Sequence, residues 1–157
     1  MPYKTLLLFF YLFFLMACKS EAQKKITFKI QKSDAEWKMQ LTDLEYYVMI
    51  KEGTEPAFSS PLDKNYSSGT YVCKGCENPL FLSSHKFNSG SGWPSFDSEI
   101  KGNVAFSVDY NIGILRTEEH CASCGAHLGH VFNDGPKKTT GKRHCINGIA
   151  LKFIPKK

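Results

Sequence analysis

The chain has 157 residues, 42% of them hydrophobic and 22% charged, and this balance excludes a long disordered protein. The formal net charge is +5, and the basic residues are spread along the chain rather than clustered between aromatic side chains. Because nucleic-acid binding favours such clusters, we expect a solvated surface and no nucleic-acid partner. Removing an N-terminal prefix of seventeen residues leaves 140, enough for one globular domain.

The prefix has the features of a secretory signal. Lys4 precedes an apolar run from Leu6 to Ala17, whereas a membrane-spanning helix needs about twenty residues. The run ends in Leu15-Met16-Ala17-Cys18, which resembles the lipobox of bacterial lipoproteins, in which the cysteine is diacylated and becomes the mature N-terminus. The alternative is an ordinary cleaved signal in which Cys18 has no special role.

The predicted domain organisation follows from this prefix. Residues 1–17 are expected to be a lipoprotein signal peptide, and residues 18–32 a lipidated, lysine-rich tether that can end in a short strand. Residues 33–157 form the functional domain. Acyl chains on Cys18 hold such a domain stably at a membrane surface, so we expect an extracytoplasmic, membrane-anchored lipoprotein of the bacterial envelope.

Two short helices are predicted at the start of the domain. Ser33-Asp34-Ala35-Glu36 matches a capping box, and Thr42-Asp43-Leu44-Glu45 repeats the pattern before a second helix that closes at Gly53. Trp37 and Leu41 are four residues apart, on one face of the first helix. That face is expected to pack against the rest of the domain.

The remainder of the chain is predicted to be mainly antiparallel β. No helix-length periodic segments separate the apolar runs, as the crossovers of a parallel sheet would require. The expected strands are Thr70 to Cys73, Pro79 to Phe81, Val104 to Val108, Ile112 to Thr117, Leu128 to Phe132 and Arg143 to Phe153.

Four cysteines have the spacing of a metal site. Cys73-Lys74-Gly75-Cys76 and Cys121-Ala122-Ser123-Cys124 are two Cys-x-x-Cys pairs, and each presents two thiolates from one tight turn. Two such turns complete a tetrahedron around Zn²⁺ and leave no open position for a substrate, so the ion would be structural, with one per chain. Disulfides are the competing interpretation; a thioredoxin-like redox pair is disfavoured because no βαβ pattern surrounds either motif.

One further cysteine lies near the C-terminus, in Arg143-His144-Cys145-Ile146-Asn147. In a strand, Arg143, Cys145 and Asn147 share one face, while His144 and Ile146 lie on the other. A guanidinium beside the thiol is expected to lower its pKa and to make it more nucleophilic. By itself, however, a single cysteine in a strand is more often part of an inert core.

Several ordered motifs give the chain a family resemblance. They are Gly53-Thr54-Glu55-Pro56, the two Cys-x-x-Cys pairs, Gly92-Trp93-Pro94-Ser95-Phe96, Arg116-Thr117-Glu118, His127 to Pro136, and the terminal Arg143 to Asn147 segment followed by Ala150 to Phe153. Together they resemble the type B methionine sulfoxide reductases, over roughly Trp37 to Phe153. The resemblance implies a twisted antiparallel core of two sheets with short N-terminal helices, and zinc ligands at Cys73, Cys76, Cys121 and Cys124.

The resemblance also implies roles for the residues that match the family's site. Cys145 is the expected nucleophile at the sulfoxide sulfur; His127, His130 and Asn147 match the acid and polar partners, with His130 favoured as the proton donor. Trp93 matches an aromatic wall that receives the substrate's methyl group, and Phe132 is expected to line the same pocket. Arg143 is placed with substrate binding or the thiol pKa, and Glu118 is expected to orient a water or a histidine.

The chain departs from the family pattern at two positions near the expected site. His144 stands where an aromatic residue usually precedes the nucleophile, and it adds a titratable group. Ser91 stands where some members carry a resolving cysteine. The cycle is therefore expected to end in a sulfenic acid on Cys145 that an external thiol or a thioredoxin-like partner reduces.

The leading hypothesis is a monomeric, lipid-anchored and zinc-stabilised reductase that repairs methionine-R-sulfoxide in proteins under oxidative stress. The alternative is a zinc-containing β domain that binds a partner and has lost catalysis. Retention of Cys145 and both histidines favours the enzyme, since a non-catalytic descendant is expected to lose them.

Overall fold

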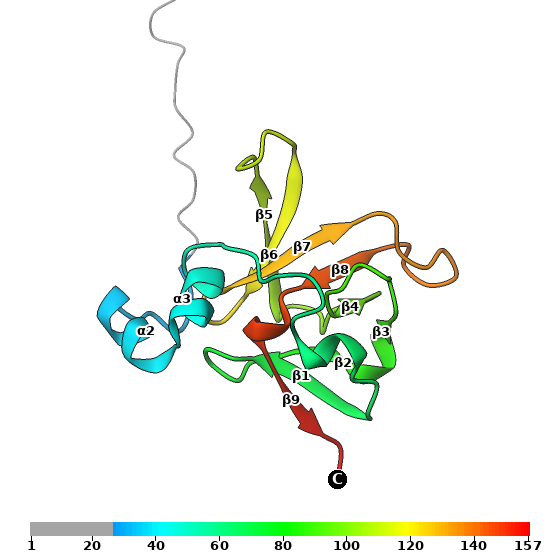
Figure 1. Cartoon of the computed structure of the whole chain (residues 1–157), viewed down its shortest axis with the longest axis horizontal. Coiled ribbons are helices and arrows are strands. Elements are labelled where there is room, and N and C mark those ends of the chain that lie inside the picture. Colours follow the sequence, from blue (N-terminus) through cyan, green and yellow to red (C-terminus); the bar gives the residue numbers. More distant parts are fainter. Residues whose placement is uncertain (1–26) are drawn as a thin grey trace, which may run out of the picture.

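Two antiparallel sheets form the body of the protein in a computed structural model that describes residues 27–157 (Figure 1). The predicted signal peptide and Cys18 lie outside the described residues. The smaller sheet has the order β2-β1-β9, and the larger sheet has the order β3-β4-β8-β7-β6-β5. The strands are β1 Gly69–Cys73, β2 Pro79–Leu82, β3 Lys86–Phe87, β4 Ser95–Phe96, β5 Val104–Asp109, β6 Arg116–Cys121, β7 His127–Phe132, β8 Arg143–Ile146 and β9 Leu151–Pro155. The mainly β fold class with two sheets is thereby confirmed.

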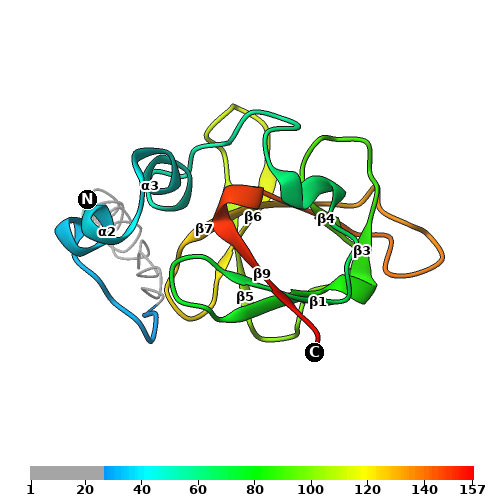
Figure 2. The same cartoon turned by 60° about the horizontal axis from the view of Figure 1, so that its bottom comes forward.

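Two α-helices precede the strands, α2 Asp34–Gln40 and α3 Asp43–Met49, and lie to one side of the sheets (Figures 1 and 2). Both predicted capping boxes are present. The side-chain oxygens of Ser33 and Thr42 accept from the backbone amides of Glu36 and Glu45, and the two glutamate carboxylates accept from the backbone amides of Ser33 and Thr42. Trp37 is buried. Three short 3-10 helices complete the described elements, at Pro61–Lys64, Ser83–His85 and Gly148–Ala150. None of the described helices is long and apolar enough to cross a membrane.

Aromatic side chains from both sheets form the centre of the core. The rings of Phe81 in β2 and Phe96 in β4 stack at 4.4 Å, and Tyr71 in β1 meets Phe96 edge-on at 4.9 Å. All three side chains have no exposed surface. Offset and edge-on aromatic pairs stabilise a core beyond the area they bury, so these contacts hold the two sheets together.

Strand β1 occupies the middle of the smaller sheet and joins distant parts of the chain. It pairs with β2 on one side and with β9, the last strand, on the other, where Cys73 lies opposite Leu151. The backbone amide of Lys74 also donates to the carbonyl of Ala150, at 2.9 Å. The C-terminal strand is therefore fixed directly beside the first Cys-x-x-Cys turn.

Several predicted element boundaries are wrong for local reasons. Residues 112–115 form part of the hairpin turn, where Gly113 takes a left-handed φ of 75°, and β6 therefore begins only at Arg116. The predicted strand from Arg143 to Phe153 is broken at Asn147 by the 3-10 helix. Strands β3 and β4 were not predicted, since two-residue strands carry no periodicity.

The end of the predicted tether also differs from expectation. Residues 27–32 form no strand, but Ile30 donates its amide to the carbonyl of Ser123 at 2.8 Å. The ring of Phe28 lies edge-on to His120 with the ring centres 6.1 Å apart. The last residues of the expected tether are thus attached to the domain.

Candidate active site and metal centre

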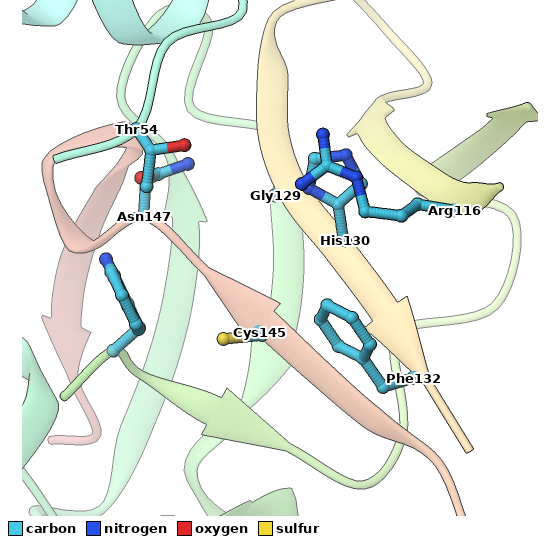
Figure 3. Close-up of a pocket in the computed structure, with 8 residues that line it drawn as sticks. Thr54, Arg116, Gly129, His130, Phe132, Cys145 and Asn147 are labelled. Carbon is cyan, nitrogen blue, oxygen red and sulfur yellow. The ribbon is translucent and has the colours of Figure 1, made fainter. Parts of the chain in front are cut away.

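A surface pocket lies where β7 and β8 meet the loop that precedes β4 (Figure 3). Its walls come from segments far apart in the sequence. The lining residues are Thr54, Trp93, Arg116, Gly129, His130, Phe132, Cys145 and Asn147. The pocket thus combines a thiol, an imidazole and two aromatic rings.

The pairing of β7 with β8 places the thiol beside the imidazole. His130 lies directly opposite Cys145 in the register, so both side chains occupy one face of the sheet. The two strands approach closely at Gly129, where an added Cβ would lie 2.0 Å from the carbonyl oxygen of Cys145. Only glycine fits at position 129, and its φ of 156° suits glycine as well.

The alternation predicted for β8 is confirmed. Arg143 and Cys145 are partly exposed, whereas His144 and Ile146 are fully buried on the other face. Nδ1 of His144 is hydrogen-bonded to Oε1 of Glu119 at 2.5 Å, and the centre of its ring lies 5.7 Å from that of Phe81. The titratable group added at position 144 therefore faces the core and not the pocket.

The expected acidity of Cys145 is not what the structure supports. Burial raises the pKa of the Cys145 thiol, and the opposing effects of Ser91 and Arg143 do not cancel it. The Ser91 hydroxyl lies 3.8 Å from the Cys145 sulfur and is hydrogen-bonded to Ser89 at 2.8 Å. The prediction that Arg143 leaves the thiol with a lowered pKa is wrong, because desolvation outweighs the nearby positive charge.

Besides its effect on the Cys145 thiol, Arg143 contacts groups outside the pocket. Its Nε and one terminal nitrogen both donate to the carboxylate of Asp134 at 2.9 Å, and its guanidinium lies 4.5 Å from the centre of the Phe132 ring. The structure places Arg143 behind Phe132 and not among the pocket-lining residues. Arg143 therefore supports one aromatic wall.

His130, in β7, is held by a carboxylate from β5, a strand that is separated from β7 by β6. Nε2 of His130 lies 2.7 Å from Oδ2 of Asp109, at the end of β5, and Arg116 donates to the same oxygen. The amide of Asn111, together with His130 and Arg116, lowers the pKa of Asp109 to about 2. Burial lowers the pKa of His130 and outweighs the effect of Asp109.

His127 is oriented by a different carboxylate. Its Nδ1 lies 2.6 Å from Oε1 of Glu118, and its side chain is 2% exposed. Burial alone would raise the pKa of Glu118, but hydrogen bonds from His127 and Ser107 outweigh it and lower that pKa. The His127 and His130 rings meet edge-on with their centres 5.5 Å apart, and of the two only His130 lines the pocket.

Glu55 holds the opposite wall of the pocket. Its buried carboxylate accepts from the amides of Gly148 and Ile149, at 2.5 and 2.9 Å. Its backbone carbonyl accepts from Nε1 of Trp93 at 3.2 Å, and its amide donates to Oδ1 of Asn147 at 3.0 Å. Burial of the carboxyl raises the pKa of Glu55 despite the two amides.

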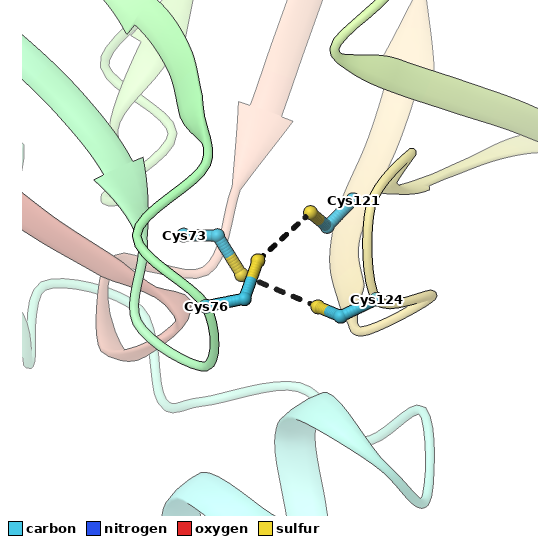
Figure 4. A group of neighbouring side chains, drawn as sticks. All are labelled: Cys73, Cys76, Cys121 and Cys124. Carbon is cyan, nitrogen blue, oxygen red and sulfur yellow. Dashed lines mark hydrogen bonds between the residues drawn. The ribbon is translucent and has the colours of Figure 1, made fainter. Parts of the chain in front are cut away.

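The four predicted metal-ligating cysteines form one cluster (Figure 4). Their sulfur atoms all lie within 4.8 Å of one another; Cys73 is 3.8 Å from Cys124, and Cys76 is 3.5 Å from Cys121. Both separations exceed the length of a disulfide bond, about 2.05 Å. A tetrahedron with metal–sulfur bonds of about 2.3 Å has edges of about 3.8 Å, so the cluster fits a Zn²⁺-sized ion.

The electrostatics of the cluster also favour a cation. Hydrogen bonding to Cys121, with the burial of the site, raises the pKa of Cys73, while hydrogen bonding to Cys124 lowers the pKa of Cys121. Four adjacent thiols cannot all ionise without a compensating charge. A divalent metal ion supplies that charge, and the four cysteines can therefore hold one.

Some residues that line the pocket or hold its lining residues in place had no role in the sequence analysis. Asp109 was missed altogether, since nothing in its local sequence links it to a histidine two strands away. Thr54, Glu55 and Arg116 belong to recognised motifs, which was a usable signal, but a motif alone does not say which group each side chain contacts. Glu118 was expected to orient a water or a histidine, and it contacts His127.

Comparisons with known proteins show which family the chain belongs to. Residues 41–155 match the family described as "SelR domain". The protein named "Peptide methionine sulfoxide reductase MsrB" of Leptospira interrogans serogroup Icterohaemorrhagiae serovar Lai (strain 56601) is 50% identical over 129 residues, 82% of this chain and 98% of that protein. Its namesake in Agrobacterium fabrum (strain C58 / ATCC 33970) is 48% identical over 128 residues, 81% of this chain and 94% of that protein.

A eukaryotic relative extends the similarity. The mouse protein named "Methionine-R-sulfoxide reductase B3, mitochondrial" is 43% identical over 140 residues, 88% of this chain and 53% of that protein. The present chain therefore belongs to the SelR-domain family of type B methionine sulfoxide reductases, and it is an enzyme of that family. The resemblance inferred from the motifs is confirmed.

Proposed function

We propose that this protein reduces the R epimer of methionine sulfoxide in polypeptides to methionine, with Cys145 as the nucleophile. The observation that carries the proposal is the placement of Cys145 and His130 side by side on one sheet face, in a pocket that also contains Trp93 and Phe132. A sulfoxide has an electrophilic sulfur and a basic oxygen, so its reduction needs a soft nucleophile and a proton donor together.

The chemical step transfers oxygen from the substrate to the enzyme. The Cys145 sulfur attacks the sulfoxide sulfur while the sulfoxide oxygen is protonated, which forms a sulfur–sulfur bond. The hydroxyl group then moves from the substrate sulfur to the Cys145 sulfur as the sulfur–sulfur bond and the substrate's sulfur–oxygen bond break, and methionine leaves. Cys145 is oxidised to a sulfenic acid, and the substrate is reduced by the same two electrons. The proton of the Cys145 thiol, whose pKa burial raises, passes to the imidazole of His130, and the same proton is the one that the sulfoxide oxygen gains.

His130 is the proposed proton donor. It lines the pocket opposite Cys145, while His127 lies behind it, 2% exposed and hydrogen-bonded to Glu118. Asp109 holds Nε2 of His130, so Nδ1 is the nitrogen left for the exchange of protons with the substrate. His127 and Asn147 act as positioning residues in this scheme.

Trp93 supplies the surface for the substrate's methyl group. Its indole lines the pocket and is fixed through Nε1 by the Glu55 carbonyl at 3.2 Å. A flat apolar face that accepts only the methyl group leaves one orientation for the oxygen, toward His130. This restriction would select one sulfoxide epimer.

An external thiol completes the proposed cycle. The five cysteines in the described part of the chain are all free, and four of them form the metal cluster. The Cys145 sulfenic acid condenses with an external thiol to give a mixed disulfide and water; a second thiol then releases Cys145 as a thiol and leaves as a disulfide. A small thiol or a thioredoxin-like dithiol fits this role.

The metal ion is proposed to be a structural Zn²⁺ held by Cys73, Cys76, Cys121 and Cys124. Bound there, it would neutralise the thiolates and fix the turns after β1 and β6. Four protein ligands leave no position for a substrate, so the ion takes no part in the chemical step.

The cellular location is proposed from the prefix alone. A diacylated Cys18 would keep the enzyme on the outer side of a bacterial membrane, as a monomer, with access to oxidised envelope proteins. Metabolic labelling with a clickable fatty acid tests this location: label on the wild type and none on Cys18→Ser is expected, and unlabelled wild type would contradict it.

The activity is tested on the full chain in mild detergent. With dithiothreitol and an equal mixture of the two sulfoxide epimers of N-acetyl-methionine amide, we expect half of the substrate to be consumed, all of it R. Without reductant, one methionine per enzyme should form, with a sulfenic-acid adduct on Cys145 alone by mass spectrometry. Absence of turnover in zinc-loaded protein would favour a binding module instead, and Cys145→Ser is the matched inactive control.

A further inference from the structure

The hairpin between β5 and β6 carries an unusual number of exposed apolar side chains. Residues 110–115, defined here as the hairpin tip, read Tyr-Asn-Ile-Gly-Ile-Leu and contain no charge. Tyr110, Ile112, Ile114 and Leu115 are each more than 60% exposed. Figure 1 shows this hairpin extending away from the body of the protein. Exposed apolar clusters of this kind mark interaction surfaces.

The tip is continuous with the pocket. Asp109, the residue before it, contacts His130, and Arg116, the residue after it, lines the pocket (Figure 3). Consecutive Cα atoms are about 3.8 Å apart, so the Cα atom of Ile114 lies at most about 7.6 Å from that of Arg116. A polypeptide that places a side chain in the pocket therefore has the tip within reach of the residues next to that side chain.

A second exposed ring lies beyond the other wall. Phe58 is 67% exposed, and its amide donates to the carbonyl of Gly92, next to Trp93, at 2.7 Å. Thr54 and Arg116 lie on different sides of Cys145 in Figure 3. Apolar surface is therefore available on both sides of the pocket.

The composition of the hairpin favours a polypeptide over a membrane surface. Segments that lie in membrane interfaces are rich in Lys and Arg, but the hairpin tip carries neither, and Arg116, the only Lys or Arg of β5 and β6, is paired with Asp109. Methionine is mostly a buried residue, and the residues that share its buried face, two to four positions away along a strand or helix, are apolar neighbours as well. A chain that exposes an oxidised methionine also exposes those neighbours.

We infer that the hairpin tip is a subsite for apolar residues that flank the oxidised methionine in an unfolded polypeptide substrate. The inference rests on the proposed function and adds a specificity determinant to it. Side chains one to three positions from the methionine would contact Ile112, Ile114 and Leu115. The enzyme would therefore prefer oxidised segments with apolar residues around the sulfoxide over segments with polar residues there.

The test compares substrates in one set of variants. Ile112→Ser/Ile114→Ser removes apolar surface from the tip, and Met39→Ser/Ile154→Ser removes exposed apolar side chains from α2 and β9 as the matched control. The substrates are N-acetyl-methionine-R-sulfoxide amide, a nine-residue peptide with Leu and Val around the sulfoxide, and the same peptide with Ser and Gly there. Each kcat/KM is measured with dithiothreitol.

We expect the tip variant to lose about tenfold in kcat/KM on the apolar peptide, since two buried aliphatic contacts are removed. Its values on the small substrate and the polar peptide should stay within twofold of the wild type, and the control variant should match the wild type throughout. Equal values for tip variant and wild type on the apolar peptide would overturn the inference.

Two further measurements separate the remaining outcomes. Fluorescence anisotropy of the labelled apolar peptide, measured in a Cys145→Ser background, reports peptide binding without turnover. Weaker binding when the tip substitutions are added supports the inference. If the wild type reduces no sulfoxide, that result refutes the proposed function and leaves the binding result standing. If tip residues instead govern flotation with phosphatidylglycerol vesicles, or self-association by light scattering, and peptide binding is unchanged, the subsite is refuted.

Discussion

The carboxylate of Asp109 contacts the imidazole of His130 across an intervening strand. Asp109 ends β5, His130 lies in β7, and the Oδ2–Nε2 distance is 2.7 Å. Arg116, in the strand between them, donates to the same carboxylate oxygen. The position of the proposed proton donor therefore depends on a residue 21 positions away in the sequence.

Replacing Asp109 by Asn should destabilise the protein and do so only where the carboxylate is ionised. The pKa of Asp109 is lowered from 3.8 to about 2, so its ionised form stabilises the folded state above about pH 4, and this contribution disappears as the pH falls toward 2. A loss of about 1.5 to 3 kcal/mol is expected at pH 7, the range for hydrogen bonds to charged groups. Urea unfolding from pH 3 to 7 measures it. Glu52→Gln, an exposed carboxylate, is the control, and a pH-independent deficit would contradict the explanation.

Exchange of the two histidines for glutamine distinguishes their roles. His130→Gln should lower kcat by about 100-fold or more, the usual contribution of a general acid, with little change in KM. His127→Gln should have a smaller effect, because its ring is held by Glu118 behind the pocket. Steady-state kinetics on the R epimer decides the matter, and the reverse order of effects would exchange the two assignments.

Loss of the indole should impair both binding and the chemical step. Trp93→Ala is expected to raise KM and lower kcat together, because the ring buries the methyl group and also restricts the sulfoxide to one orientation.

Glu55→Gln should weaken the hydrogen bonds to the Gly148 and Ile149 amides and shift Trp93 indirectly. Its activity loss should be smaller and accompanied by a lower melting temperature; Glu55→Gln with wild-type stability would count against this role.

Removing the metal should cost far more stability than removing the catalytic thiol. Chelation, or Cys121→Ser, is expected to lower the free energy of unfolding by several kcal/mol, since apparent binding energies of structural zinc reach about 10–16 kcal/mol in small domains. Cys145→Ser, outside the cluster, is the matched control and should melt close to the wild type. Calorimetry with metal analysis checks this, and an apo protein with an unchanged melting temperature would show that the cluster is not a structural site.

The reactivity of the catalytic thiol should increase up to alkaline pH. Burial raises the pKa of Cys145, whereas Ser91 and Arg143 oppose that shift, so Ser91→Ala should raise the pKa further. Alkylation of Cys145 by iodoacetamide, followed by mass spectrometry from pH 6 to 10, should be slower for Ser91→Ala at pH 8. Ser98→Ala, a serine that bonds only the Glu99 carbonyl, should leave the profile unchanged. A thiol that is fully reactive at pH 6 would refute the raised pKa.

Local signals in the sequence predicted much of this fold correctly. Both capping boxes, the antiparallel class and the metal cluster follow from short-range patterns. These are a serine or threonine three residues before a glutamate, apolar runs without crossover helices between them, and repeated Cys-x-x-Cys spacing. The alternation around Cys145 also follows from the strand period.

The parts that could not be predicted depend on contacts between distant segments. The pairing of Asp109 with His130 requires three strands in register, and the hydrogen bond from Trp93 to Glu55 joins two loops. The sign of the Cys145 pKa shift depends on how far the fold buries the thiol, which the neighbouring arginine does not reveal. Sequence motifs identified these segments but not their partners.

The pairing of β1 with β9 has a consequence for the order of events during biosynthesis. Residues 151–155 follow every proposed catalytic residue in the sequence and complete the sheet that holds Cys73, and the short 3-10 helix before them receives the Glu55 carboxylate. Neither the metal cluster nor the pocket can reach its final form on a nascent chain that still lacks these residues. Premature termination after Asn147 would retain every proposed catalytic residue and yet leave a polypeptide unable to mature.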